Sequence, residues 1–284
     1  MSLLDADLEA SEDIFTAQCD NPAEVLLVLR ALEFKEKPKL YCTVSIDKTG
    51  MKFVVESHKS FQGRAFFDHA FFSEWDLRSD VVLIFCIGLR DFMAAIGCLS
   101  TKNSVIKLTM EDEKTTVKDR RLNIFADDGK FKANLSLPVF NTTSDEYDFR
   151  FYDVETIAEI KLEAKTIKSV FREIDIKEYP TITFSFQPNR CCISTKSETG
   201  KVSTLFTKGS RDAIQIICDG DSFHFKYRSI FIKRLKYATN NASKVSLAMN
   251  DNGILRVQVC LAKIDQHSAF IEFYTIPVVE AREM

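Results

Sequence analysis

The chain has 284 residues, of which 45% are hydrophobic and 28% charged, and its formal net charge is −3. This length suits one large domain or two of ordinary size, and the near-balanced charge argues against a strongly basic, free-standing nucleic-acid binder. The 9 glycines are few, which argues against glycine-rich phosphate loops and against disorder.

The N-terminal tail, residues 1–12, is acidic and lacks the layout of a signal peptide. The sequence contains no run of about 18 apolar residues, so we expect no membrane-spanning helix. The 8 cysteines lie mostly in apolar runs and form no C-x-x-C pair, which favours buried free thiols in a reducing compartment over disulfides or a zinc site. We therefore expect an intracellular protein that needs no metal, no other cofactor and no membrane.

The first half of the chain predicts a strand-rich unit with two helices. Asn21 and Pro22 open the first helix as its cap and first-turn proline, and residues 89–99 form the second. Alternation of apolar residues predicts a β-hairpin over 40–55, and the aromatic-rich stretch 61–77 is predicted to be extended. Further strands are predicted over 15–19, 81–85, 105–112, 121–126 and 130–137.

The second half restates this order. A strand at 158–163 precedes a helix over 166–174, and a second helix over 229–241 is predicted to turn Ile230, Phe231 and Leu235 inward. A hairpin over 182–195 has Pro188-Asn189 near its turn. Further strands are predicted over 202–206, 214–218, 223–227, 244–249, 254–261 and 269–275.

Two sequence matches indicate an internal duplication. Lys35-Glu36-Lys37-Pro38 resembles Lys177-Glu178-Tyr179-Pro180 at an offset of 142 positions, and Met110 to Pro138 aligns with Met249 to Pro277 without a gap at an offset of 139. We therefore predict an α+β protein of two tandem domains, each strand-rich with two helices. The predicted parts are an N-terminal tail at 1–12, domain 1 at 13–138, a connector at 139–152, domain 2 at 153–278 and a C-terminal tail at 279–284.

The second-half helices carry cations opposite their apolar stripes. The residues on these faces are Lys165, Lys168, Arg172, Lys233, Lys236 and Tyr237, with Arg234 beside them. On the first-half helices only Arg30 and Arg90 stand out, and acidic neighbours dilute them. Such a face is either a solvated surface or a surface that tracks the phosphates of nucleic acid, which needs cations but no base-specific geometry.

The order and spacing of several short segments resemble those of eukaryotic sliding clamps, in the PCNA-like clamp superfamily. The resemblance covers about residues 13–280. It is closest to the checkpoint clamp of the nine-one-one complex, to the subunit with the "one" designation in the radiation-sensitivity series. The segments that carry it are Val55-Glu56, Gln62, Ala65-Phe66, Phe72 with Glu74, Phe171 to Asp175, Lys244-Val245-Ser246, Asn252-Gly253, Leu255 and Glu272-Phe273-Tyr274 before Pro277.

The resemblance implies two clamp domains whose sheets lie outside and whose helices line a ring. It implies that the chain is one subunit of a heterotrimer whose other two members are homologous clamp subunits. An ATP-dependent clamp loader would place this ring around double-stranded DNA without sequence preference. Loading at damaged or stalled DNA would support checkpoint signalling and DNA repair in the nucleus. Ring closure would pair exposed edge strands of neighbouring subunits, for which Ile106-Lys107-Leu108 and the strand ending at Cys218 are candidates.

The resemblance also implies two sites. The residues that would face DNA are Arg30, Arg90, Lys165, Lys168, Arg172, Lys233, Lys236 and Tyr237. The residues that would line a hydrophobic groove for peptide motifs of repair or signalling proteins are His58, Phe140, Tyr147, Ile276 and Pro277. The sequence departs from the replicative clamp at Asp91 and Ala94, which stand in place of lysines, so an even ring of positive charge is not expected.

Enzyme activity is not expected. A metal-dependent nuclease needs converging carboxylates, but the acidic groups at 111–113, Asp127-Asp128 and Asp219 with Asp221 sit between strands, where acidic turn residues are ordinary. The 4 histidines show no metal-ligand spacing. The alternatives are a replicative homotrimeric clamp, an exonuclease, and a membrane or cytoskeletal adaptor, for which no basic amphipathic helix is free.

Overall fold

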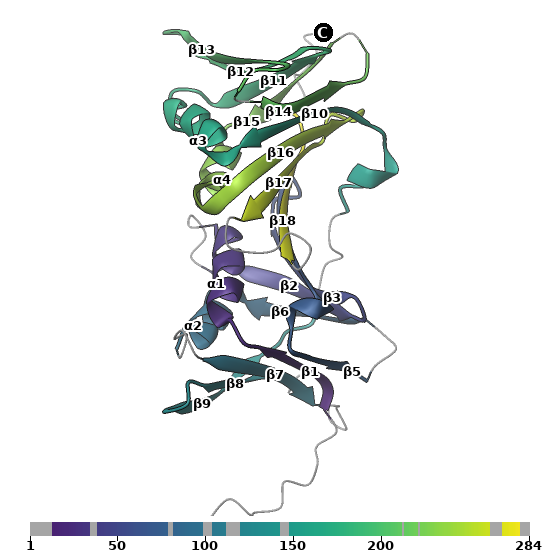
Figure 1. Cartoon of the computed structure of the whole chain (residues 1–284), viewed down its shortest axis with the longest axis vertical. Coiled ribbons are helices and arrows are strands. Elements are labelled where there is room, and N and C mark those ends of the chain that lie inside the picture. The colour runs from purple at the N-terminus through teal and green to yellow at the C-terminus, as the bar shows by residue number, and fades with distance from the viewer. Residues whose placement is uncertain are drawn as a thin grey trace, which may run out of the picture. The chain divides into compact units, whose positions relative to one another are not determined.

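The structure, a computed structural model, describes residues 13–34, 39–78, 82–98, 104–111, 120–142, 148–211, 213–220, 222–261 and 269–278 (Figure 1). The chain divides into two compact units. Unit 1 comprises Met1–Leu29, Lys39–Phe53 and Phe66–Asp145, and unit 2 comprises Arg30–Pro38, Val54–Ala65 and Glu146–Met284. Two short segments of the first half, 30–38 and 54–65, therefore belong to unit 2.

The first half of the chain carries the predicted series of strands and helices. Its elements are β1 (Asp13–Cys19), α1 (Pro22–Ala31), β2 (Tyr41–Asp47), β3 (Gly50–Ser57), β4 (Phe61–Asp68), η1 (His69–Phe71), β5 (Glu74–Leu77), β6 (Leu83–Gly88), α2 (Leu89–Gly97), β7 (Val105–Glu111), β8 (Arg121–Asp127) and β9 (Lys132–Pro138). The aromatic-rich stretch is not one extended segment, because η1 separates β4 from β5. Asp68 initiates that turn by accepting a hydrogen bond from the backbone N–H of Ala70 at 2.8 Å.

The second half repeats the order of strands and helices of the first. Its elements are η3 (Phe151–Asp153), β10 (Thr156–Glu163), α3 (Ala164–Glu173), β11 (Thr181–Gln187), β12 (Arg190–Lys196), β13 (Lys201–Thr207), β14 (Ala213–Cys218), β15 (Phe223–Arg228), α4 (Ile230–Asn241), β16 (Ala242–Asn250), β17 (Leu255–Leu261) and β18 (Ala269–Thr275). In its described residues, each half is strand-rich with two α-helices, which confirms the predicted tandem α+β fold. Within the described parts of the chain, no helix is long and apolar enough to cross a membrane.

The predicted gapless alignment of Met110 to Pro138 with Met249 to Pro277 is wrong. The equivalent strands β8 and β17 begin at Arg121 and Leu255, which are 134 positions apart instead of 139. The connection between β16 and β17, residues 251–254, is shorter than the one between β7 and β8. Strand pairing fixes the repeated architecture, whereas the connections tolerate changes in length.

In unit 1, one antiparallel sheet has the order β5-β1-β7-β8-β9. Phe15, Ala17 and Cys19 of β1 are buried, because alternate side chains of a strand point to the same face. β7 pairs with β1 on one side and with β8 on the other. The prediction that Ile106 to Leu108 forms an exposed edge strand is therefore wrong, and the strands at the ends of this sheet are β5 and β9.

In unit 2, the strands β14, β10, β16, β17 and β18 follow one another, and β18 lies next to β4. Phe61 of β4 stacks on Phe273 of β18 with 5.9 Å between ring centroids. Gly63 allows this close approach, because a Cβ atom there would lie 3.1 Å from the Phe273 ring. A second sheet has the order β13-β12-β11-β15. The strand ending at Cys218, β14, lies at the end of its sheet as predicted.

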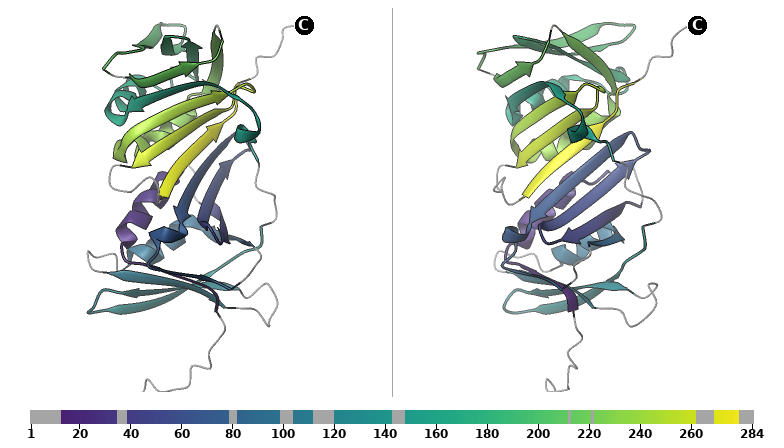
Figure 2. Two further views of the ribbon diagram at one scale, coloured as in Figure 1. Left: turned by 45° about the vertical axis from the view of Figure 1, so that its right-hand side comes forward. Right: turned by 90° about the vertical axis from the view of Figure 1, so that its right-hand side faces the viewer.

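Helices α3 and α4 lie side by side on one face of the β10–β16–β17 sheet (Figure 2). Phe231 and Leu235 of α4 are buried as predicted, but Ile230 is 37% exposed and Ile232 only 3%. The inward orientation predicted for Ile230 is therefore wrong. Buried Ser229 fixes the start of the helix, since its N–H donates to Pro180 O at 3.0 Å and its hydroxyl donates to Tyr179 O.

Two short turns shape unit 2. Pro188-Asn189 joins β11 to β12, as predicted. Residues 58–60 join β3 to β4, and His58 and Lys59 in this turn have φ values of 53° and 50°. Both residues thus occupy the left-handed region, where hairpin turns prefer asparagine or glycine. The sequence offers neither residue there, so this turn was not predicted, and its backbone carries strain.

Candidate nucleic-acid and peptide sites

Four of the predicted DNA-facing cations lie together between α3 and α4. Residues three or four positions apart share one face of a helix, which places Lys168 with Arg172 on α3 and Lys233 with Lys236 on α4. All four are exposed and line one cavity of about 520 Å³. The cavity is lined by Lys168, Phe171, Arg172, Ile174, Ile176, Ile232, Lys233, Lys236, Thr239 and Asn240.

The other two residues predicted on these faces, Lys165 and Tyr237, are not among the residues that line this cavity. Lys165 is exposed on α3, and Tyr237 is half-buried on α4 with its carbonyl oxygen accepting a hydrogen bond from the Asn241 amide at 2.9 Å. Lys168 spans the two helices, because its ammonium group donates to the Asn240 carbonyl oxygen at 3.4 Å. The structure therefore groups four of the six cationic-face residues of α3 and α4 around one hollow.

Arg30 and Arg90 lie on α1 and α2, respectively. Arg30 is exposed in the last turn of α1, where a cation suits the helix dipole. Arg90 is half-buried in the first turn of α2, beside exposed Asp91. An acidic residue there suits the positive end of the helix dipole, which gives Asp91 a structural role.

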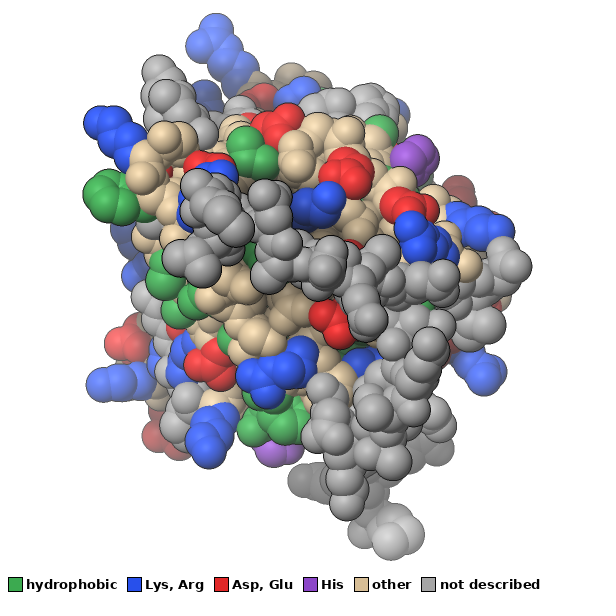
Figure 3. Space-filling view, turned by 90° about the horizontal axis from the view of Figure 1, so that it is seen from below, with side chains coloured by type: hydrophobic (Ala, Val, Ile, Leu, Met, Phe, Trp, Pro, Cys, Tyr) green, Lys and Arg blue, Asp and Glu red, His purple; other side chains and the backbone are tan. Residues whose placement is uncertain are grey.

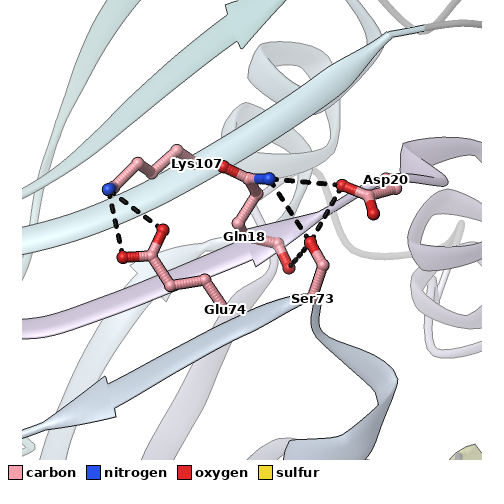
Figure 4. A network of polar contacts seen from close by, with 5 residues as sticks. All are labelled: Gln18, Asp20, Ser73, Glu74 and Lys107. Carbon is pink, nitrogen blue, oxygen red and sulfur yellow. Dashed lines mark hydrogen bonds and ion pairs between the residues drawn. The ribbon is translucent and has the colours of Figure 1, made fainter.

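Other surfaces carry both signs of charge. The face in Figure 3 shows Lys and Arg side chains interspersed with Asp and Glu. Figure 4 shows such a mixture in unit 1, where the Lys107 ammonium group lies 3.1 Å from a Glu74 carboxylate oxygen, and Ser73 donates to Asp20 at 2.9 Å. These exposed groups satisfy one another, as on an ordinary solvated surface. The α3–α4 cavity differs because none of its described lining residues is acidic.

A second cavity, of about 450 Å³, contains part of the predicted peptide groove. Its lining residues are Ser57, His58, Ser60, Phe61, Arg228, Ile230, Phe231, Arg234, Thr275, Ile276, Pro277 and Val278. The chain after β18 borders it, because the Ile276 N–H donates to Ser60 O at 3.3 Å and the Val278 N–H donates to Lys226 O at 2.7 Å. The structure thus brings together three predicted groove residues: His58, Ile276 and Pro277.

The sequence did not identify several residues of this second cavity. Arg234, predicted to lie beside the outward cations, instead donates to the Ser57 hydroxyl at 3.0 Å and covers the Phe61 ring at 5.0 Å. Arg228 and Ile230 also line the cavity. The signal in the sequence is Ile230 at the first position of its helix, where an apolar side chain has no preceding turn to pack against.

Of the two remaining predicted groove residues, Phe140 is not among the described residues that line this cavity. Phe140 is exposed in unit 1, where its backbone pairs with that of Cys86 through hydrogen bonds of 2.8 and 2.9 Å. The Phe140 ring meets Tyr41 edge-on, with centroids 5.9 Å apart. Tyr147 lies outside the described residues.

The end of the predicted connector is anchored in unit 2. Phe149 and Phe151 are buried in a cluster with Tyr274. The Arg256 guanidinium lies 5.0 Å over the Phe151 ring and donates to the Tyr152 hydroxyl at 2.8 Å. Burial acts to lower the pKa of Arg256, but neighbouring Tyr152 and then Glu272 outweigh it, so the pKa is raised. Arg256 thus stays charged at the centre of an aromatic and acidic cluster.

Two of the acidic residues considered for metal binding, Asp127 and Asp128, have a structural role in a turn. Asp127 accepts a hydrogen bond from the Gly129 N–H at 2.8 Å, and Asp128 accepts from the N–H groups of Lys130 and Phe131. These backbone hydrogen bonds lower the pKa of both carboxyl groups. Within the described residues, no group of three or more His, Cys, Asp and Glu side chains could hold a metal ion. Residues 112–113 and Asp221 lie outside that part of the chain.

Comparison with known proteins places the fold and the family. The chain resembles one chain in the crystal structure of the PCNA2–PCNA3 complex from Sulfolobus tokodaii, with a TM-score of 0.70, 15% identity, and coverage of 93% of this chain and 100% of that one. It is 23% identical to the "cell cycle checkpoint protein RAD1 homolog mrt-2" of Caenorhabditis elegans, over 94% of this chain and 98% of that protein. It is 24% identical to the human "cell cycle checkpoint protein RAD1", over 100% and 99%. Residues 14–261 match the family described as "Repair protein Rad1/Rec1/Rad17", and the chain therefore belongs to this family.

Proposed function

We infer that the chain is one subunit of a heterotrimeric checkpoint clamp that encircles double-stranded DNA and is loaded where DNA is damaged or stalled. The observation that carries this function is the cationic cavity that α3 and α4 form together. Such a rigid face can track phosphates without reading bases. The family, the names of the relatives and the clamp fold support the same function.

The repeated topology indicates how the ring would close. Within the chain, β4, the fourth strand of the first repeat, lies next to β18, the last strand of the second. The equivalent strands are β13 and β9, and each lies at the end of a described sheet. We expect β9 of one subunit to pair with β13 of the next, because such pairing removes exposed edges. The partners are two homologous clamp subunits.

The weak net charge suits a ring. A protein held on DNA by topology needs few attractive contacts, and many would hinder sliding. The eight predicted DNA-facing residues would provide these contacts from the helices of domain 1 (13–138) and domain 2 (153–278). An ATP-dependent loader would open the ring in the nucleus, since a closed ring cannot pass over continuous DNA unaided.

The second cavity would bind peptide motifs of repair or signalling proteins. Its exposed apolar residues Ile230 and Ile276 offer contacts for an aromatic or aliphatic anchor. The strained turn at His58 fits a binding role, because strain concentrates at functional sites.

A charge-reversal experiment tests the DNA contact. In the assembled ring, Lys233→Glu/Lys236→Glu should weaken association with duplex DNA about tenfold or more, with the larger loss at low salt. The control is Lys208→Glu/Arg211→Glu, which changes the same charge in the exposed turn before β14 and should leave binding unchanged. Equal binding by both variants would show that the α3–α4 face is merely solvated.

The subunit composition and the absence of catalysis are tested separately. The native mass of the endogenous complex should correspond to one copy each of three chains of similar size, whereas a homotrimer would indicate a replicative clamp.

Purified protein should not degrade labelled DNA with Mg²⁺ or Mn²⁺. Degradation abolished by Asp127→Ala or Asp219→Ala would instead support the exonuclease alternative.

A further inference from the structure

The cavity between α3 and α4 has two kinds of wall. The rim is cationic and consists of Lys168, Arg172, Lys233 and Lys236. The floor is apolar and consists of Phe171, Ile174, Ile176 and Ile232. The volume of about 520 Å³ falls in the usual range of small-molecule sites, about 300–1,000 Å³.

Duplex DNA alone would leave this floor uncovered. In a double helix the bases are stacked and paired inside, so the phosphates contact the rim while no base reaches the floor. An unpaired nucleotide carries a flat, largely apolar base next to a phosphate. Bases of single strands stack on aromatic side chains inside positively charged grooves. The combination of rim and floor therefore favours an unpaired nucleotide over a duplex.

The rim and part of the floor are accessible to such a ligand. Ile176 is half-buried in the segment after α3, so part of the floor already faces the hollow. Lys168 contacts the other helix through a long hydrogen bond of 3.4 Å to Asn240 O, which a phosphate oxygen can replace with a shorter, charge-assisted bond. The exposed amide of Asn240 offers both a donor and an acceptor to the edge of a base.

We propose that the α3–α4 cavity binds one unpaired nucleotide of single-stranded DNA, with the phosphate on the cationic rim and the base on the apolar floor. The inference rests on the proposed DNA-facing role of α3 and α4. It adds a preference for unpaired over paired DNA in this subunit.

Two probes of equal charge test the base contact. A labelled oligothymidine of about eight nucleotides and an abasic phosphodiester of the same length are titrated with the full chain, and binding is followed by fluorescence anisotropy. The oligothymidine should bind about tenfold more tightly, since each stacked base adds to affinity. Equal affinities would overturn the proposal, because the cations alone would then account for binding.

Three variants separate the floor from the rim. Ile176→Ser should abolish the preference for oligothymidine and leave the abasic probe unchanged. Lys236→Ser should weaken the binding of both probes and leave the ratio of their affinities unchanged. Lys165→Ser removes an exposed cation of α3 outside the cavity, so it should also keep the ratio. A preference that survives Ile176→Ser in a variant with an unchanged unfolding transition would place the base elsewhere and overturn the proposal.

A competition experiment addresses a peptide as the occupant. A Glu-rich peptide of matched charge with one Phe should displace oligothymidine no better than a Glu-rich peptide without Phe. Better displacement by the Phe peptide would identify the occupant as an acidic peptide and overturn the proposal. The assembled ring could still bind duplex DNA through Lys233 and Lys236 while the chain binds oligothymidine and the abasic probe with equal affinity. In that case only this inference fails, and the proposed function stands.

Discussion

Arg234 and Ser57 are 177 positions apart in the chain, yet the Arg234 guanidinium donates a hydrogen bond of 3.0 Å to the Ser57 hydroxyl. The same guanidinium lies 4.9 Å from the centroid of the Phe34 ring and 5.0 Å from that of Phe61. Ser57 is buried and Arg234 is half-buried. One arginine of α4 therefore ties together the second cavity, the β3–β4 turn and the segment after α1.

We predict that Arg234→Lys lowers the free energy of unfolding by about 1–2 kcal/mol. Lysine keeps the charge but has no planar guanidinium to stack on two rings while it donates to Ser57. Chemical denaturation measures the difference. The neighbouring exposed residue provides the control, since Lys233→Arg should change stability by no more than about 0.5 kcal/mol. If Arg234→Lys lowered the free energy of unfolding by no more than this control, the Arg234 contacts would add nothing to the stability of the fold.

We expect the free energy of unfolding to depend more strongly on Arg256 than on Arg234. The Arg256 guanidinium lies 4.0 Å from a Glu272 carboxylate oxygen, and Glu272 is only 5% exposed. Arg256→Met leaves this carboxylate buried without its cation, which costs about 3–5 kcal/mol. Arg256→Met/Glu272→Gln should recover part of the loss, because a neutral amide needs no counter-charge. Urea unfolding of both variants, beside Lys196→Met at the exposed end of β12, measures the effect, and no recovery in the double variant would contradict the charge argument.

Burial of Cys19 predicts a pH dependence of stability. Burial raises the pKa of this thiol from 9.0 to about 11. Above pH 9 the thiol ionises in the unfolded chain but not in the folded one, so the folded state holds more protons and its stability falls as pH rises from 9 to about 11. The slope from this group is about 1.4 kcal/mol per pH unit.

Cys19→Ala should remove that part of the slope, and Cys98→Ala should not, because Cys98 is exposed. Other groups that titrate in this range are the same in both variants and cancel in the comparison. The measurement is the free energy of unfolding in urea with a reductant, just below pH 9 and just below pH 11. Equal slopes for the two variants would show that the Cys19 thiol is not shifted.

Much of the fold could be predicted because it is encoded locally. Alternating apolar residues located most strands, and Pro188-Asn189 marked the β11–β12 turn. Helical spacing also predicted that Lys168 and Arg172 share a face, so the cationic part of the first cavity could be foreseen. The α4 orientation was predicted less well, because the contacts of Ser229 with distant Tyr179 and Pro180 fix where that helix begins.

The order of strands in a sheet could not be read from the sequence. Periodicity shows that Ile106 to Leu108 alternates, but it does not show that both β1 and β8 pair with this strand. The β3–β4 turn was missed because His58-Lys59 lacks the glycine or asparagine that marks such turns. Arg234 was misjudged for a similar reason, since its partners Ser57 and Phe61 are distant in sequence.

Ring closure through β13 predicts a specific sensitivity to charge on that strand. Leu205 of β13 is 56% exposed, so Leu205→Glu should leave the stability of the isolated chain unchanged within about 0.5 kcal/mol. A charge at a paired edge should oppose association, as it does on the edge strands of monomeric proteins. Ile214→Glu is the matched control, because Ile214 is 49% exposed on β14, the end strand of the neighbouring sheet. Sedimentation with the two partner subunits should show loss of the heterotrimer for Leu205→Glu only, whereas loss for Ile214→Glu only would move the contact to β14.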